Sequence, residues 1–154
     1  MVSSEEFDAL LGTATLHAKQ HGAEVIDLVV RGDRMHRVIE LFVDSEGGVT
    51  LDLCQEISKS LVQEIEKNKT LAGTYRLDVS SPGLDRPLKF PWQYRKHAGR
   101  IVEVTWEQNG TRDVVRGKLL TVDEDGVEVQ AGKGPESRRI AFNAMIETRV
   151  KTPW

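Results

Sequence analysis

The sequence predicts an α+β protein in two parts. Residues 1–88 read as an N-terminal two-layer domain with the order α-β-β-α-β, and residues 89–154 as a small C-terminal β-barrel. Two observations predict this division. Helical and strand periodicities alternate up to Leu88, whereas only short strand patterns separated by turn residues follow it. The joint is expected at about residues 84–99, within a chain of 154 residues that suits two small domains.

An amphipathic helix is expected from Ser3 to Gln20. Ser3 and Glu6 have the spacing of a capping box, in which each side chain bonds a free backbone N–H of the first turn. Apolar residues then recur at helical spacing, and Gly22 is suited to follow the last turn. This helix begins the first layer of the domain.

Two strands, a second helix and a third strand complete the N-terminal domain. Residues 23–30 and 35–43 are rich in Val, Ile and Leu around a polar turn, which predicts a β-hairpin. Thr50 can cap the second helix, and residues 75–79 alternate as a strand. A right-handed crossover through this helix would make the second and third strands parallel. Two helices would then cover one face of a three-stranded sheet.

Short strands dominate the C-terminal part. Asn109-Gly110 is a strong hairpin signal between the first two of them. The expected strands span 100–107, 112–122, 126–131 and 137–142, with a short fifth at 149–152. Antiparallel strands with turns at this spacing predict a small barrel. Residues 89–99, with their proline and aromatic residues, form the joint.

Composition excludes several classes of protein. No apolar run approaches the ~18 residues that span a bilayer, so no membrane association is expected. The acidic N-terminus lacks the features of a signal peptide. The single cysteine, Cys54, lies on the apolar stripe of the second helix, where a thiol packs. We therefore expect a cytoplasmic protein and a monomer.

Charge is distributed unevenly along the chain. Residues 1–88 contain 9 Lys and Arg against 15 Asp and Glu, and residues 89–154 contain 12 against 9. The N-terminal part is therefore acidic and the C-terminal part modestly basic. This polarity favours phosphate contacts by the C-terminal part, although an excess of this size also arises by chance.

Metal binding and catalysis are the main alternatives to a binding role. His17 and His21 share a helix face at a spacing that can bind zinc, but a third ligand is not obvious, although Glu24 is near in sequence. The structural interpretation is a histidine beside the apolar stripe and another at the helix end. Asp123-Glu-Asp-Gly126 lacks the alternate aspartates of a calcium loop and is expected to be a hairpin turn. No phosphate-binding loop or nucleophile elbow is present, so we expect no enzyme, metal or cofactor.

The segment Tyr75–Leu88 is the most unusual in the chain. Pro82-Gly83 suits the centre of a type II turn, because Pro fixes φ at one position and Gly allows positive φ at the next. The candidate functional residues of this segment are Ser80, Ser81, Pro82, Gly83, Leu84, Asp85, Arg86 and Pro87. They form either a rigid strut between domains or a direct contact surface.

This segment carries a resemblance to a known family. Val-Ser-Ser-Pro-Gly-Leu-Asp-Arg-Pro-Leu, at Val79–Leu88, resembles the signature of the RimP ribosome maturation factors. The similarity extends to residues 48–58 and 139–147, and covers about residues 38–150. Lys59 and Asp78 depart from the residues usual in the family, arginine and glutamate.

The resemblance implies both a fold and a role. The implied fold is an N-terminal α/β domain joined to a C-terminal SH3-like (Sm-like) barrel. The implied role is non-catalytic, chaperone-like binding of the free small (30S) ribosomal subunit during its late assembly. The implied partners are 16S ribosomal RNA and small-subunit ribosomal protein twelve. The alternative is a general RNA-binding adaptor that uses an Sm-like barrel.

Basic side chains of the C-terminal part are the candidate contacts with ribosomal RNA. They are Arg95, Lys96, Arg100, Arg112, Arg116, Lys118, Lys133, Arg138 and Arg139. Strand periodicity places Arg112, Arg116 and Lys118 on one face. Such a face is typical both of phosphate binding and of simple solvation, and both interpretations stay open.

Overall fold

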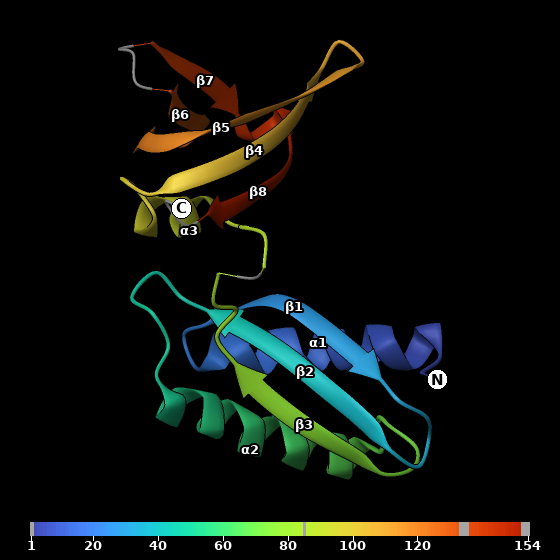
Figure 1. The fold of residues 1–154 in the computed structure, drawn as a ribbon. Helices are drawn as coiled ribbons and strands as arrows, with labels where there is room; N and C mark the ends of the chain where they lie inside the picture. The colour runs from blue at the N-terminus through green and yellow to red at the C-terminus, as the bar shows by residue number, and fades with distance from the viewer. Residues whose placement is uncertain (1, 85, 133–135, 152–154) are drawn as a thin grey trace. The chain divides into compact units, whose positions relative to one another are not determined.

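The computed structural model describes residues 2–84, 86–132 and 136–151, so the candidate residues Asp85 and Lys133 lie outside the described residues. The chain forms two compact units, Met1–Pro82 and Gly83–Trp154 (Figure 1). The division falls within the segment Tyr75–Leu88. Each unit has its own buried core and is described by itself.

The N-terminal unit has the predicted order of elements. They are α1 (Ser4–Gln20), β1 (Glu24–Arg31), β2 (Arg37–Asp44), α2 (Leu51–Asn68) and β3 (Tyr75–Ser80). The central strand, β2, pairs antiparallel with β1 and parallel with β3. The predicted hairpin and the predicted parallel crossover through α2 are therefore both confirmed.

Side chains fix where both long helices begin. The Ser3 hydroxyl accepts the Glu6 backbone N–H at 3.0 Å, and the Glu6 carboxylate accepts the Ser3 N–H at 3.4 Å. The Thr50 hydroxyl accepts the Leu53 N–H at 3.1 Å. Each bond satisfies an amide that has no partner within its helix. The capping box and the threonine cap predicted from the sequence are confirmed.

The two long helices pack on one face of the sheet. Leu10 of α1, Ile57 and Leu61 of α2, and Ile39 and Leu41 of β2 are fully buried in one apolar cluster. The β2 residues alternate in burial, as expected for a strand with one covered face. Figure 1 shows α1 and α2 lying along this sheet. The predicted two-layer arrangement is therefore present.

A buried arginine joins three parts of this unit. Arg37, at the start of β2, is 1% exposed. Its guanidinium donates to the Glu6 carboxylate at 3.2 Å and to the Ala72 carbonyl at 3.0 Å. It therefore links the first turn of α1 to the loop that precedes β3. The Ser3 N–H, and after it Arg37, lowers the pKa of Glu6 below its usual value.

The C-terminal unit is mostly antiparallel sheet. Its elements are α3 (Pro91–Lys96), β4 (Ile101–Gln108), β5 (Thr111–Val122), β6 (Gly126–Ala131), β7 (Ser137–Ala141), the 3₁₀ turn η1 (Phe142–Ala144) and β8 (Met145–Lys151). The sheet order is β7-β6-β5-β4-β8. Helix α3 was not predicted within the joint, and the last strand begins four residues earlier than predicted. Strand β8 is longer because it pairs along β4 from Trp106 to Ile101.

The five-stranded sheet must curl. Strands β7 and β8 lie at opposite edges, yet only the three residues of η1 separate them. Opposite edges of a flat five-stranded sheet lie roughly 19 Å apart, whereas the four steps from Ala141 to Met145 span at most about 14 Å. Among the described residues, however, no pairing between β7 and β8 closes the sheet. The predicted barrel closure is therefore not confirmed.

One glycine allows the close approach of two strands in this sheet. A Cβ atom on Gly117 would collide with the backbone carbonyl of Gln130 in β6. The core beneath is a single cluster that includes Val104, Trp106 and Leu119. Gly117 lies between the core-facing Val115 and Leu119 of β5, and its missing side chain lets β6 approach closely. In the part of the chain that the structure describes, no helix is long and apolar enough to cross a membrane.

Two neighbouring leucines of β5 test this core. Leu119 is fully buried, whereas Leu120 is 36% exposed. Replacing Leu119 with Ala should lower the free energy of unfolding of the C-terminal unit by about 2–5 kcal/mol, because a cavity remains in the core. The matched Leu120→Ala variant should change it by less than about 1 kcal/mol. Urea unfolding followed by tryptophan fluorescence measures both; equal losses would contradict the assigned strand faces.

Candidate nucleic-acid interface

The exposed face of β5 carries three of the predicted basic contacts. Arg112, Arg116 and Lys118 are exposed, whereas Val115 and Leu119 of the same strand face the core. Successive side chains of a strand point to opposite faces. The three cations therefore share one face of the sheet, in the arrangement that period two predicts.

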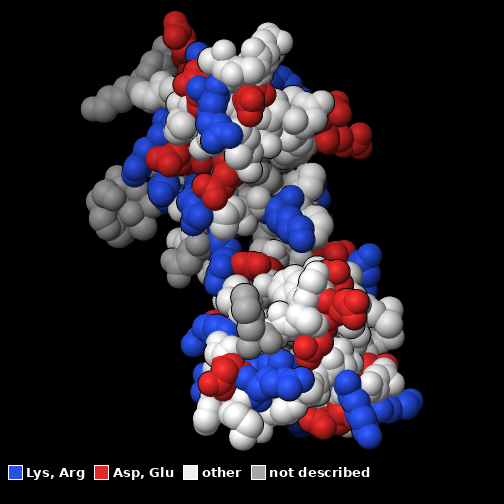
Figure 2. Space-filling model, turned by 90° about the vertical axis from the view of Figure 1, so that its right-hand side faces the viewer, with Lys and Arg blue, Asp and Glu red and all other residues white. Residues whose placement is uncertain are grey.

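Neighbours on β4 give this face two different ends. Arg112 lies opposite Glu107, with 3.9 Å between guanidinium and carboxylate, and Lys118 lies opposite the apolar Ile101. Among the described residues Lys118 makes no ion pair. Figure 2 shows Lys and Arg interleaved with Asp and Glu over the part of the C-terminal unit that it draws. The face is thus of mixed charge, and the Lys118 end has fewer acidic neighbours.

Strand β8 adds two cations that sequence analysis missed. Lys151 lies opposite Ile101, and Arg149 lies opposite Glu103. Arg149 also bonds Glu147 of its own strand at 3.2 Å. The pairing of β8 with β4 is not local in sequence, so no local signal placed these residues on the face. The sequence shows that both residues are basic, but it does not show which residues of β4 they lie opposite.

Backbone hydrogen bonds hold the segment that follows α3 at the Lys118 end of this face. The Gly99 N–H donates to the Leu119 carbonyl at 2.7 Å, and the Leu119 N–H donates to the Arg100 carbonyl at 2.9 Å. Arg100 is therefore held beside Leu119, the neighbour of Lys118 in β5. Arg95 and Lys96 are exposed in the last turn of α3. Figure 1 shows α3 beside the start of β4 and the end of β8.

We call Arg95, Lys96, Arg100, Lys118 and Lys151 the basic end of the C-terminal unit. Three of the strands and helices contribute to it, together with the loop residue Arg100. Long basic side chains on a rigid framework bind phosphate oxygens and release counterions from nucleic acid. The basic end can therefore bind a phosphate backbone, although it offers no base-specific code.

The neighbouring arginines of β7 have different surroundings. The Arg138 guanidinium lies 5.5 Å from the Trp106 ring centroid and 3.7 Å from the Asp113 carboxylate. The Arg139 guanidinium binds both carboxylate oxygens of Asp123 at 2.7 Å. These contacts stabilise the unit itself. Both arginines were predicted as RNA contacts, and the structure gives each of them an intramolecular partner.

Asp123 organises the turn between β5 and β6. Its Oδ1 accepts the N–H groups of Asp125 and Gly126 at 2.8 and 3.0 Å. The Arg139 guanidinium, followed by these amides, holds the pKa of Asp123 well below its usual value. The same pair raises the pKa of Arg139. The predicted hairpin turn is therefore present, and the Asp123 carboxylate stabilises it through these hydrogen bonds.

The signature segment leaves β3 through a turn. Gly83 has a φ of +61°, the left-handed region that the predicted turn requires of it. Leu84 is 43% exposed. Ser80, Ser81 and Gly83 are also exposed, whereas Pro82, Arg86 and Pro87 are partly buried. Asp85 lies outside the described residues.

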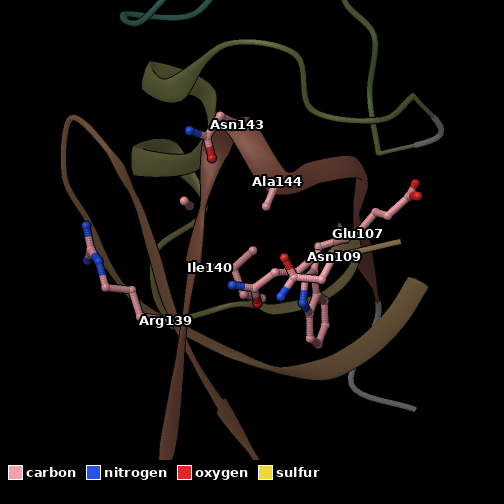
Figure 3. Close-up of a pocket in the computed structure, with 9 residues that line it drawn as sticks. Glu107, Asn109, Arg139, Ile140, Asn143 and Ala144 are labelled. Atoms are coloured by element: carbon pink, nitrogen blue, oxygen red, sulfur yellow. The ribbon is translucent and has the colours of Figure 1, made fainter. Parts of the chain in front are cut away.

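A polar pocket of about 550 Å³ lies beside the tip of β4, β7 and η1 (Figure 3). Amides of Asn109 and Asn143 line it together with the Trp106 indole. Figure 3 shows Glu107 and Arg139 at opposite sides of the pocket. No nucleophile lies beside a base among these residues. The pocket therefore offers hydrogen bonds and a ring face, and it brings together none of the basic-end residues.

The histidines predicted as alternative metal ligands make structural contacts. Nδ1 of His17 lies 2.5 Å from the Ser60 hydroxyl and so joins α1 to α2. Nδ1 of His21 lies 2.8 Å from the His17 carbonyl. No cluster of three metal-ligating side chains occurs in the described residues. Cys54 is 4% exposed, and burial raises the pKa of its thiol, which is consistent with packing.

Replacing Asp123 tests the turn. The pKa of Asp123 is lower in the folded than in the unfolded state. The ion pair therefore gives its full contribution to the free energy of unfolding above about pH 4, and this contribution is lost as the pH falls toward the folded-state pKa. Asp123→Asn should lower the Tm at neutral pH and weaken the acid dependence. Glu124→Gln, a matched exposed position in the same turn, should leave the Tm unchanged. Thermal unfolding by circular dichroism measures both; equal Tm values for the two variants would refute the assigned role.

Comparison with known proteins agrees with the signature segment. A model of the RimP N-terminal domain matches residues 14–85. A protein of Chlorobium phaeovibrioides (strain DSM 265 / 1930), "Ribosome maturation factor RimP", is 32% identical over 145 residues. The alignment covers 84% of each chain and so includes much of both units. The chain therefore belongs to the RimP family of ribosome maturation factors.

Proposed function

We propose that this protein binds the free small (30S) ribosomal subunit and assists its late maturation without catalysing a reaction. The observation that carries the proposal is the 32% identity to a ribosome maturation factor over 84% of the chain. The protein would act as a chaperone, holding one conformation of the immature subunit and then leaving. It would work in the cytoplasm as a monomer.

The proposed partner of the C-terminal unit is 16S ribosomal RNA. Arg100 and Lys118 support this proposal most strongly, because both are exposed and make no ion pair with another described residue. Arg95, Lys96 and Lys151 lie at the same end. Contact through one end of a curled sheet suits an SH3-like barrel, which is the architecture that we propose for residues 89–154.

The proposed partner of the N-terminal domain, residues 1–88, is small-subunit ribosomal protein twelve. With 15 acidic against 9 basic residues, this part of the chain is a poor ligand for RNA. Ribosomal proteins that neutralise RNA are basic, so opposite charge favours their approach to this domain. The exposed Ser80, Ser81 and Leu84 are proposed to touch the subunit where the two domains join.

Sedimentation of the protein through sucrose gradients tests the proposed function. In a lysate at low salt, the protein should co-sediment with free small subunits and not with assembled ribosomes. Absence from the small-subunit fractions would refute the proposal. Equal affinity for unrelated single-stranded RNA and for small subunits would instead favour a general RNA-binding adaptor.

Charge-neutralising variants test the basic end. The double variant Arg100→Gln, Lys118→Gln should bind purified small subunits more weakly. The slope of log K against log salt should fall by about 1.5, because each lost phosphate contact removes about 0.7–0.9. The double variant Lys59→Gln, Lys67→Gln is the matched control, since both lysines are exposed on α2 of the acidic unit. Identical slopes for the two double variants would exclude the basic end as a phosphate site.

A further inference from the structure

An aromatic pair enclosed by two lysines lies at the start of the C-terminal unit. The rings of Phe90 and Trp92 stack with 5.6 Å between centroids and 9° between planes. The Lys89 ammonium lies 5.4 Å from the Phe90 centroid, and the Lys96 ammonium lies 5.7 Å from the Trp92 centroid. We call these four residues the aromatic platform. The two lysines are exposed and the two rings are partly buried.

These two rings lie outside the apolar core that the described residues of the unit form. The described apolar core of the unit takes in Tyr94 and Trp106, but neither Phe90 nor Trp92 belongs to it. A large aromatic side chain usually stabilises a fold by burying its surface there. Two large rings that stack on each other outside the core are typical of a binding surface.

The backbone beneath the platform is held rigidly. The Gln93 carboxamide oxygen accepts the N–H groups of Lys89 and Phe90 at 2.7 and 2.9 Å, and Gln93 is 2% exposed. Pro91 fixes its own φ in the first turn of α3. The Tyr94 ring, 4% exposed, anchors the helix in the core. A ligand would therefore meet rings whose positions are set before it binds, which lowers the entropic cost of binding.

We infer that the aromatic platform binds single-stranded RNA by stacking an unpaired base on the Phe90–Trp92 pair. Every base has a flat face that stacks on an aromatic ring. The two ammonium groups lie over the ring faces, and because lysine side chains are flexible they can move aside to the adjoining phosphates when a base stacks. Two exposed lysines beside the rings bring positive charge to the platform, and this charge favours an anionic polymer over an apolar peptide. The inference deepens the proposed function, on which it rests, by naming unpaired nucleotides as the part of the RNA that is bound.

Binding of short oligonucleotides tests the platform directly. The probe is a fluorescently labelled oligouridine of about ten nucleotides, within the usual range of single-strand sites, and anisotropy gives the Kd. Phe90→Leu and Trp92→Leu should each weaken binding about tenfold, since stacking on one ring contributes roughly a factor of ten. An oligomer of equal charge that lacks its bases should bind the wild-type protein as weakly as the normal oligomer binds these variants.

The lysines should contribute differently from the rings. Lys89→Gln with Lys96→Gln should reduce the salt slope by about 1.4, because single-stranded contacts each contribute about 0.7. The ring variants should leave the slope unchanged. Lys59→Gln with Lys67→Gln, on the acidic unit, is the matched control and should alter neither quantity. Circular dichroism checks that each variant is folded. Tryptophan fluorescence gives a measurement independent of anisotropy: oligouridine should quench the fluorescence of the wild-type protein, and this quenching should be lost in Trp92→Leu.

Two results would overturn the inference. One is equal affinity of the wild-type and ring variants for oligouridine, and the other is equal wild-type affinity for the normal and base-free oligomers. If either result is obtained while the protein still co-sediments with small subunits, base stacking on the aromatic platform is refuted and the proposed function stands. If the rings bind oligouridine but the protein never enters the small-subunit fractions, the proposed function fails alone.

Discussion

The buried carboxamide of Gln93 is the interaction on which the surface of the C-terminal unit depends. It satisfies the backbone amides of Lys89 and Phe90, where the preceding loop gives way to α3. Nearby, the Leu88 N–H donates to the Thr148 carbonyl of β8 at 2.8 Å. Without these bonds the amides would lose their partners close to the core, which is costly. The directions of the platform rings and of the α3 cations both follow from this arrangement.

Local signals were sufficient for most of the N-terminal unit. The capping box at Ser3, the threonine cap at position 50 and the apolar periodicities each act over a few residues, so sequence alone locates both helices and all three strands. Buried Arg37 was not predicted. Its partners, Glu6 and the Ala72 carbonyl, are 31 and 35 residues away along the chain, and charge ordinarily indicates exposure.

The C-terminal unit was harder to predict because its organisation is less local. Helix α3 has six residues, too few for a periodic pattern, and the full length of β8 depends on pairing with β4. The sequence identifies the basic residues, but it does not show which side chains each of them contacts in the folded unit. Adjacent residues of a strand point to opposite faces, so Arg138 and Arg139 could have been separated from the sequence. Their contacts with Trp106 and Asp123 required the fold.

In the proposed binding of RNA by this unit, charge and stacking would make complementary contributions. The basic end and the platform offer few cations, and acidic residues such as Glu103 and Glu107 lie on the same sheet face. A purely electrostatic contact of this size would weaken steeply with salt, because its free energy comes from counterion release. Stacking on Phe90 and Trp92 buries ring surface and depends little on salt. At physiological salt the rings would therefore supply the larger share of the affinity, while the lysines and arginines orient the strand along the protein.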